Sequence, residues 1–367
     1  MAQFGVCLNP PHFGMNPELT VNFFDRPVGP SHPPYVIAEI GSNHNGDIDL
    51  AKQLIDEAVK SGAEAVKFQS WSTTSLISKA EYARNTEYAD KDRHFGTLYE
   101  MVERYQLTPD QHYDVAAYCR KAGIHFMSSA FCPDEVELLA DVGVPAIKIA
   151  SMDVNHPVLL EAAAKSGIPI ILSTGLSDLE EVTRAVQSLR GNGCDQLVLL
   201  HCISIYPPDP KEVNLNNIRM LRDSLQVPVG FSDHSLGTHL AVAATALGAA
   251  VIEKHYTLDK SMDGWDHWMS VDPAELAELC NDCRDAFDAL GSRTRKVSDA
   301  ELEKRKKFRR CIVLRESLGE GHQLTLEDLD FKRPGTGISP DQYTRVVGRR
   351  LAIDLEADHE LSWSDLT

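Results

Sequence analysis

The sequence predicts an α/β protein: a (β/α)8 TIM barrel followed by a small second domain. Three observations support this prediction. Short apolar, β-branched runs recur along most of the chain, amphipathic helical patterns separate them, and this alternation ends before residue 308. With 367 residues, the chain is long enough for one large domain and one small one.

Each apolar run has the composition of a parallel strand that is buried on both faces. Helical patterns lie between the runs, and the pattern at residues 50–62 ends in a glycine, which is suited to terminate a helix. A doubly wound open sheet is the alternative, but the glycine-rich first turn typical of that fold is absent. The eight runs are residues 35–41, 63–69, 125–131, 146–151, 169–175, 196–202, 227–234 and 251–256.

The domain boundaries follow from changes of pattern along the chain. Residues 1–34 are rich in proline and predict a hairpin or plug beneath the barrel, which itself takes residues 35–292. Residues 293–307 are charged and predict a linker, and residues 308–367 predict a separate domain of short strands and turns. The interval 70–124 is longer than the others and predicts an ordered excursion over one face of the barrel.

Composition excludes several classes of partner. The net charge of −18 argues against nucleic-acid binding, because neutralising phosphates needs a basic surface. Hydrophobic residues at 43% and charged residues at 25% are ordinary for a soluble globular protein. No stretch approaches the ~18 apolar residues that span a membrane, and no secretory signal is present. We therefore expect a cytoplasmic protein without nucleic-acid or membrane partners.

Polar side chains cluster where the predicted strands end, and in a barrel these ends surround one pocket. Two lysines lie where burial is expected, and a buried ammonium is costly unless an anion lies against it. Serine hydroxyls and helix N-termini at the same level add hydrogen-bond donors. Ion pairing or helix capping explains each residue singly, but the set predicts a pocket for a small, multiply charged anion. The set comprises Lys67, Lys148, Ser129, Ser151, Ser173 and Ser232.

Two histidines predict a metal site. His234 and His255 end neighbouring predicted strands, one βα unit apart. Neutral imidazole suits a divalent transition metal, and two such ligands leave positions open for water and substrate. The alternative is that one histidine caps a helix and the other is a core residue. Asp266, in the following loop, is placed to act as a base or outer ligand, unless it is an ordinary solvated loop residue.

A resemblance to a known family rests on the strand-end strings AEIGSNHNGD (38–47), VKFQ (66–69), KIAS (148–151), ILSTG (171–175), LLHCISIYP (199–207), GFSDHS (230–235) and EKHY (253–256). In this order they resemble the sialic acid synthase family, which includes N-acetylneuraminate, legionaminic and pseudaminic acid synthases and spore coat polysaccharide biosynthesis proteins. The string FKRPGTGISP (331–340) is similar to the antifreeze-like SAF domain, a β-clip fold, that is appended to these synthases. The resemblance spans nearly the whole chain from residue 35 onward.

The resemblance implies a metal-dependent condensation of phosphoenolpyruvate with the open-chain form of an N-acylated amino sugar. The products are a nine-carbon 2-keto-3-deoxy acid and phosphate, and the cofactor is Mn²⁺ or another divalent cation such as Mg²⁺ or Co²⁺. It also implies that the lysine and serine set holds phosphoenolpyruvate, that His234 and His255 bind the metal, and that Tyr206 faces the sugar. Glu39 and Asp266 are the candidates for the general base.

The resemblance further implies a homodimer in which the small domain of each chain covers the barrel mouth of its partner. Arg333 then reaches the partner's site and contacts the acyl group of the sugar. The alternative is that Arg333 binds acidic residues of its own domain.

Departures from the family pattern fall on the sugar side of the site. Met152 and Asp153 stand where Gly-Glu is usual, Ser204 replaces an asparagine, and Trp71 and Trp265 flank the site strings. These changes predict an acceptor other than plain N-acetylmannosamine. Two alternatives are a phosphoenolpyruvate-dependent synthase of a shorter 3-deoxy sugar acid, which the small domain disfavours, and a non-catalytic barrel scaffold, which the paired lysines and histidines disfavour.

Overall fold

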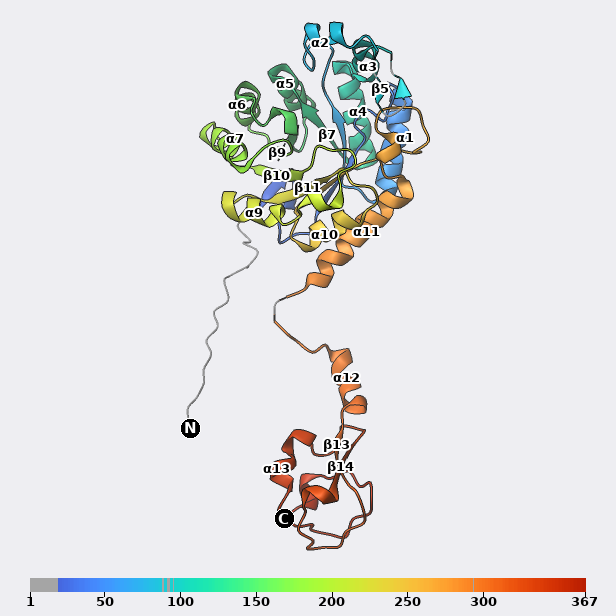
Figure 1. Cartoon of the computed structure of the whole chain (residues 1–367), viewed down its shortest axis with the longest axis vertical. Coiled ribbons are helices and arrows are strands. Elements are labelled where there is room, and N and C mark those ends of the chain that lie inside the picture. Colours follow the sequence, from blue (N-terminus) through green and yellow to red (C-terminus); the bar gives the residue numbers. More distant parts are fainter. Residues whose placement is uncertain (1–18, 88, 91–92, 95, 293) are drawn as a thin grey trace. The chain divides into compact units, whose positions relative to one another are not determined.

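Eight parallel strands close into a barrel, as the sequence predicts (Figure 1). The computed structural model describes residues 19–87, 89–90, 93–94, 96–292 and 294–367. Each of the eight predicted runs holds one strand, and the last strand pairs with the first to complete the closure. The strands are β3 (Tyr35–Glu39), β4 (Ala65–Gln69), β7 (His125–Ala130), β8 (Ile147–Ile149), β9 (Ile170–Ser173), β10 (Leu197–Cys202), β11 (Val229–Asp233) and β12 (Val251–His255).

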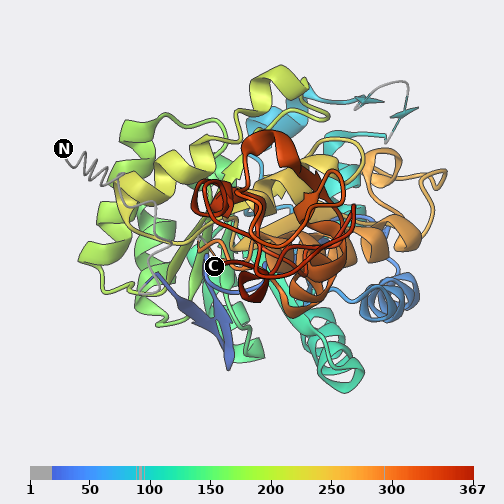
Figure 2. The ribbon, with the colours of Figure 1, turned by 90° about the horizontal axis from the view of Figure 1, so that it is seen from below.

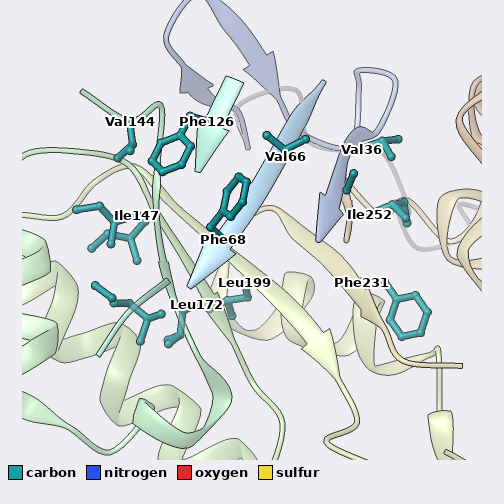
Figure 3. Close-up of a cluster of buried hydrophobic side chains, with 14 of the residues drawn as sticks. Val36, Val66, Phe68, Phe126, Val144, Ile147, Leu172, Leu199, Phe231 and Ile252 are labelled. Carbon is teal, nitrogen blue, oxygen red and sulfur yellow. The ribbon is translucent and has the colours of Figure 1, made fainter. Parts of the chain in front are cut away.

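Side chains of each strand alternate between the barrel interior and the layer beneath the helices. Val66 and Phe68 of β4 lie in this outer layer together with Phe231 and Ile252 (Figure 3). Lys67, between Val66 and Phe68, therefore faces the interior. The same alternation sorts the polar residues at the strand ends into inward and outward sets.

Helices pack around the barrel with their apolar faces inward. In the first of them, Asp47 caps the helix by accepting hydrogen bonds from the backbone N–H groups of Asp49 and Leu50, at 2.8 and 3.3 Å, and Gly62 ends it with φ +83°. The helices of this layer are α1 (Ile48–Ser61), α4 (Pro109–Ala122), α5 (Pro133–Val142), α6 (Pro157–Lys165), α7 (Leu179–Gly191), α8 (Pro210–Val213), α9 (Asn217–Leu225), α10 (His239–Ala246) and α11 (Pro273–Leu290).

A hairpin of β1 (Val21–Phe23) and β2 (Arg26–Val28) plugs the amino end of the barrel (Figure 2, dark blue). Phe23 is fully buried in a cluster with interior residues from the start of the barrel strands, among them Tyr35 and Met127. The hairpin lies within the segment predicted as a plug, of which residues 1–18 are outside the described part of the chain.

The long excursion between β4 and α4 lies over the opposite, carboxyl end of the barrel. Its elements are α2 (Lys79–Arg84), β5 (Ala89–Asp90), β6 (Arg93–His94) and α3 (Leu98–Tyr105). Met101 and Tyr105 of α3 pack with Trp71 and Phe131, which follow β4 and β7. Trp265, from the loop after β12, packs against the same cluster. The excursion is therefore anchored to the strand ends where the site was predicted.

A second unit runs from Ser292 to Thr367 and has its own small core. It begins with α12 (Asp299–Phe308), an exposed helix that occupies most of the predicted linker and ends one residue beyond it. Ser298 caps this helix by accepting a hydrogen bond from the N–H of Glu301. Two antiparallel strands follow, β13 (Cys311–Leu314) and β14 (Leu329–Lys332), then α13 (Tyr343–Val346). Short 3-10 turns, η3 (Leu326–Asp328), η4 (Pro340–Gln342) and η5 (Trp363–Asp365), complete the unit.

Throughout the described residues, every helix is too short or too polar to span a bilayer. The cytoplasmic location stays a prediction.

The loop after β3 is held by a buried histidine. His44 is 1% exposed, accepts a hydrogen bond from the Gly46 N–H at 3.1 Å through Nδ1, and packs against Phe68, with ring centroids 5.8 Å apart. Burial is the main reason that the pKa of His44 falls to about 4. The imidazole is therefore neutral in the folded protein at neutral pH.

Replacement of Phe23 by alanine is expected to destabilise the protein by roughly 3–5 kcal/mol, because it removes a fully buried aromatic ring. Phe24, the next residue, is 56% exposed, so Phe24→Ala is the matched control and should cost less than about 1 kcal/mol. Urea unfolding followed by circular dichroism measures both. Equal losses in the two variants would argue against the plug.

The buried imidazole of His44 predicts a pH dependence of stability. The pKa is lower in the folded state than the ordinary 6.5, so the unfolded chain binds the extra proton first as the pH falls. The contribution of His44 is complete above pH 6.5 and is lost as the pH falls toward 4, a change of about 3 kcal/mol. Urea titrations from pH 7.5 to 4 should show a smaller decline for His44→Gln. The exposed His239→Gln should match the wild type, and a His44→Gln curve parallel to the wild type would contradict the assignment.

Candidate active site

Four charged side chains form a buried network inside the barrel. Lys67 Nζ lies 2.7 Å from Glu39 Oε2 and 3.7 Å from Glu253 Oε2, and Lys148 Nζ lies 3.6 Å from Glu253 Oε1. All four residues are at most 5% exposed. Two ammonium groups therefore face two carboxyl groups in a site from which bulk water is excluded.

Strand register brings these four side chains together. Glu39 and Lys67 are directly opposite each other on β3 and β4. Glu253 is opposite Ser232 on the pair β11 and β12, and Lys148 comes from β8. All face the interior because each occupies an inward position of its strand.

The two carboxyl groups have opposite pKa shifts. Burial raises the pKa of Glu39 to about 7, although Lys67 beside it acts in the other direction. Burial also disfavours the Glu253 carboxylate, but the ammonium groups of Lys148 and Lys67 and the Ser232 hydroxyl outweigh it and lower its pKa to about 2. Glu253 is thus a fixed anion, whereas Glu39 can gain or lose a proton near neutral pH.

The lysines also differ from each other. Burial lowers the pKa of Lys148, and Glu253 offsets this only in part. For Lys67 burial acts in the same direction, but Glu253 and Glu39 together hold its pKa above the ordinary value. An anion that enters this network therefore meets the firmly charged ammonium of Lys67. It would also stabilise the charged form of Lys148, whose pKa is lowered.

Serine hydroxyls surround the charged groups. Ser129 accepts a hydrogen bond from Lys67 Nζ at 3.2 Å, and Ser232 donates to Glu253 Oε1 at 2.8 Å. Ser151 Oγ accepts from the Gly175 backbone N–H at 3.1 Å. Ser173 is 2% exposed, and its Oγ lacks a hydrogen-bond partner among the described residues. A buried hydroxyl left unsatisfied in this position suits an incoming ligand.

Two imidazoles lie beside the network. The rings of His234 and His255 are 5.5 Å apart between centroids, and Tyr206 stacks on His234 at 4.1 Å. His234 Nδ1 lies 2.9 Å from the carbonyl of Ile203, which fixes Nδ1 as the donor, so the neutral ring has its lone pair on Nε2. Burial holds the pKa of His255 well below its usual range, and the charges of His234 and Lys67 act in the same direction.

The donor set fits a divalent cation with open coordination positions. Asp266 Oδ2 lies 3.8 Å from His255 Nδ1, so a carboxylate is close to the imidazole pair. In the part of the chain that the structure describes, no cluster of three or more His, Cys, Asp or Glu side chains has metal-binding geometry. Burial lowers the pKa of His234, but Cys202 and the Ile203 carbonyl outweigh it and raise that pKa above its ordinary value. Once His234 has lost its proton, the two imidazoles would hold such a cation with water and substrate in its other positions.

The residues predicted on the sugar side lie at the barrel mouth. Asp153 ends the 3-10 turn η1 (Ser151–Asp153). Burial raises the pKa of its carboxyl group to about 6, and Oδ2 has no hydrogen-bond partner within the described chain. Ser204 approaches Gly175 closely, because a Cβ at Gly175 would lie 2.4 Å from Ser204 Oγ. Tyr206 is 42% exposed. A cavity of about 550 Å³ adjoins Ser204 between β10, α7 and α9.

Arg333 lies in the second unit, where its guanidinium group is 5.0 Å from the centroid of the Phe308 ring. All the other predicted site residues lie in the barrel unit. The contact of Arg333 with a partner's site stays a prediction.

The sequence places Glu253 and Gln69 among the strand-end residues but assigns them no role, and it does not single out Cys202. Glu253 precedes His255 by two positions on one strand, so the strand period of two places both side chains inward. Gln69 Nε2 donates to Glu39 Oε1 at 3.2 Å, and the Cys202 thiol lies 3.9 Å from His234 Nδ1. For Glu253 and Gln69 the available signal was the alternation of side chains along a strand, which places them on the same face as His255 and Lys67 respectively.

Comparisons with known proteins agree with the fold and identify the family. Residues 54–295 match the NeuB family, and residues 309–367 match the SAF domain. The chain is 42% identical over 349 residues to the N,N'-diacetyllegionaminic acid synthase of Legionella pneumophila, covering 93% of this chain and 97% of that protein. It is 35% identical over 338 residues to the N-acetylneuraminate-9-phosphate synthase of Homo sapiens, covering 91% and 92% of the two chains.

A solved structure of a related protein has the same fold. The N-acetylneuraminic acid synthetase of Leptospira borgpetersenii superposes with a TM-score of 0.70 at 32% identity, covering 78% of this chain and 94% of that one. The barrel fold is thus shared with this synthetase. The chain belongs to the NeuB family of sialic acid synthases.

Proposed function

We propose that this protein condenses phosphoenolpyruvate with the open-chain form of an N-acylated amino sugar, giving a nine-carbon 2-keto-3-deoxy acid and phosphate. The observation that carries the proposal is the presence of two buried lysines, Lys67 and Lys148, beside the imidazoles of His234 and His255. The family membership and the names of the relatives support the same reaction class.

Phosphoenolpyruvate carries a phosphate and a carboxylate, which suit the two ammonium groups. In the proposal Lys67 and Lys148 contact these anions, and Ser129, Ser151, Ser173 and Ser232 donate hydrogen bonds to them. Fixed donors of this kind stabilise charge during the reaction with little reorganisation. The unsatisfied Oγ of Ser173 supports this assignment.

The imidazole pair supports a requirement for a divalent cation, Mn²⁺ or a chemically similar ion. His234 and His255 would hold such a cation, which would act as a Lewis acid toward the aldehyde oxygen of the acceptor. The Ile203 carbonyl keeps the Nε2 lone pair of His234 available, and burial keeps His255 neutral. Tyr206, stacked on His234, limits the position of the acceptor at the mouth.

The reaction forms one carbon–carbon bond and, at C2, forms one carbon–oxygen bond to water and breaks one to phosphate. C3 of phosphoenolpyruvate attacks the aldehyde carbon, and the aldehyde oxygen takes up a proton to become a hydroxyl. Water adds to C2 and loses a proton, and the tetrahedral intermediate then loses its hydroxyl proton and expels phosphate to leave the ketone. We assign Glu39 as the acceptor of the proton from water, because a carboxyl group whose pKa is about 7 is an effective base at neutral pH. Asp266 is the alternative base, near His255.

The acceptor is proposed to differ from plain N-acetylmannosamine. The buried, unsatisfied Oδ2 of Asp153 and the short Ser204 side chain alter the positions that face the sugar. The identity to a diacetyllegionaminic acid synthase, 42%, also exceeds the 35% identity to an N-acetylneuraminate-9-phosphate synthase. A diacylated amino sugar is therefore the first acceptor to test.

A domain-swapped homodimer completes the proposal. In it, the SAF domain of each chain covers the barrel mouth of its partner, and Arg333 contacts the acyl group of the sugar bound there. The family membership and the C-terminal SAF domain support this assembly.

Phosphate release from phosphoenolpyruvate tests the reaction. We expect release only when an N-acylated amino sugar is present, faster with a diacylated hexosamine than with N-acetylmannosamine. Release should stop on chelation with EDTA and return with Mn²⁺. Release with aldose phosphates alone would indicate a synthase of shorter acids, and no release with any acceptor would favour a non-catalytic scaffold.

The metal assignment is tested by binding rather than turnover. Replacement of His234 by alanine removes one of two imidazole ligands, so calorimetric Mn²⁺ affinity should fall by at least tenfold, in line with the loss of a direct ligand. His239→Ala changes an exposed histidine of α10 and should bind Mn²⁺ like the wild type. Unchanged affinity in His234→Ala, with the circular dichroism spectrum preserved, would rule out the assignment.

A further inference from the structure

A chain of hydrogen bonds leads from the excursion to Glu39. Trp71 Nε1 donates to Gln69 Oε1 at 2.7 Å, and Gln69 Nε2 donates to Glu39 Oε1 at 3.2 Å. The other oxygen of Glu39, Oε2, faces Lys67 at 2.7 Å. One oxygen of the carboxyl group thus accepts a hydrogen bond from Gln69, and the other forms an ion pair with Lys67.

The Trp71 indole decides which way the Gln69 amide faces. An indole N–H can only donate a hydrogen bond, whereas the amide of Gln69 has a carbonyl at one end and an NH₂ group at the other. The carbonyl must therefore face Trp71, which directs the NH₂ group toward Glu39. With no N–H at position 71, the amide can turn its carbonyl toward Glu39, where two oxygens repel each other.

Packing holds the Trp71 ring in this position. Trp71 is 2% exposed and lies in the cluster of Leu98, Met101 and Tyr105 from α3. Trp265, next to Asp266, packs against the same cluster. The ring is therefore held by the excursion and by the loop that carries the second candidate base.

Gly41 leaves room for the bond between Gln69 and Glu39. A Cβ at this glycine, whose φ is +53°, would lie 3.2 Å from Glu39 Oε1 and 3.5 Å from Gln69 Nε2. The backbone N–H groups of Ile40 and Gly41 both donate to the Lys67 carbonyl, at 2.9 and 3.1 Å. The turn after β3 is thus shaped around the carboxyl group.

We propose that Trp71 is a positioning residue that fixes the orientation of the Glu39 carboxyl group through the Gln69 amide. The excursion of residues 70–108 then contributes to the reaction by holding an indole against the amide beside the base. This inference rests on the proposed function, in which Glu39 accepts a proton from water.

A double-mutant cycle tests the positioning role. Trp71→Phe keeps a buried ring but removes the N–H, and we expect kcat to fall about tenfold, the effect of one lost hydrogen bond in a reacting site, with KM for phosphoenolpyruvate within about twofold. Gln69→Met should lower kcat by a similar factor. Trp71→Phe added to Gln69→Met should then change kcat by less than about twofold, because the contact is already gone.

A matched control addresses simple disruption of the cluster. Tyr82 packs against the same cluster, and Tyr82→Phe removes a buried hydroxyl that has no hydrogen-bond partner among the described residues. Its kcat should stay within about twofold of the wild type. Multiplicative losses in the double variant, or a loss in Tyr82→Phe equal to that in Trp71→Phe, would overturn the positioning role.

A spectroscopic readout separates this inference from the proposed function. The indole N–H resonance of Trp71, identified in ¹H–¹⁵N spectra by its absence in Trp71→Phe, should move upfield in Gln69→Met as its acceptor is lost. An unchanged resonance would overturn the inference even in an active enzyme. Wild-type protein that releases no phosphate with any acceptor would overturn the proposed function, while the resonance would still decide whether Trp71 orients Gln69.

Discussion

The pairing of two buried ammonium groups with two buried carboxyl groups is the constraint on which the structure depends. Charges this deep in a protein are tolerated only when opposite charges and hydrogen bonds surround them. Here the partners come from strands far apart in sequence, Glu39 and Lys67 at one end of the barrel domain and Glu253 at the other. Only the closed sheet brings β12 next to β3, so the site exists only when the barrel is complete.

Much of this arrangement could be predicted because strands impose a period of two. The apolar neighbours Val66 and Phe68 mark Lys67 as inward, and the eight apolar runs were sufficient to recognise the barrel. The sequence analysis did not use the same period at β12. Applied there, the period of two places Glu253 toward the barrel interior and Lys254 toward the helix layer. Lys254 pairs there with Asp233 at 2.9 Å.

Other features depend on tertiary contacts that no local pattern encodes. The predicted strand 146–151 ends at Ile149, and Ser151 instead begins a 3-10 turn, where its hydroxyl meets the Gly175 N–H of the next βα loop. The exposed helix α12 has no apolar face, so its sequence resembles a charged linker. The orientation of the Gln69 amide follows from an indole that only the folded chain brings near.

The hairpin at the amino end of the barrel affects the order in which substrates can bind. Because Phe23 and its neighbours fill that end, ligands reach the charged network through the mouth, past Tyr206. A molecule bound to Lys67 and Lys148 lies deeper than one bound beside Tyr206, so the deeper one must arrive first and cannot depart while the other remains. Under the proposed reaction, this geometry leads to compulsory-order kinetics with phosphoenolpyruvate as the leading substrate, a pattern that product-inhibition measurements reveal.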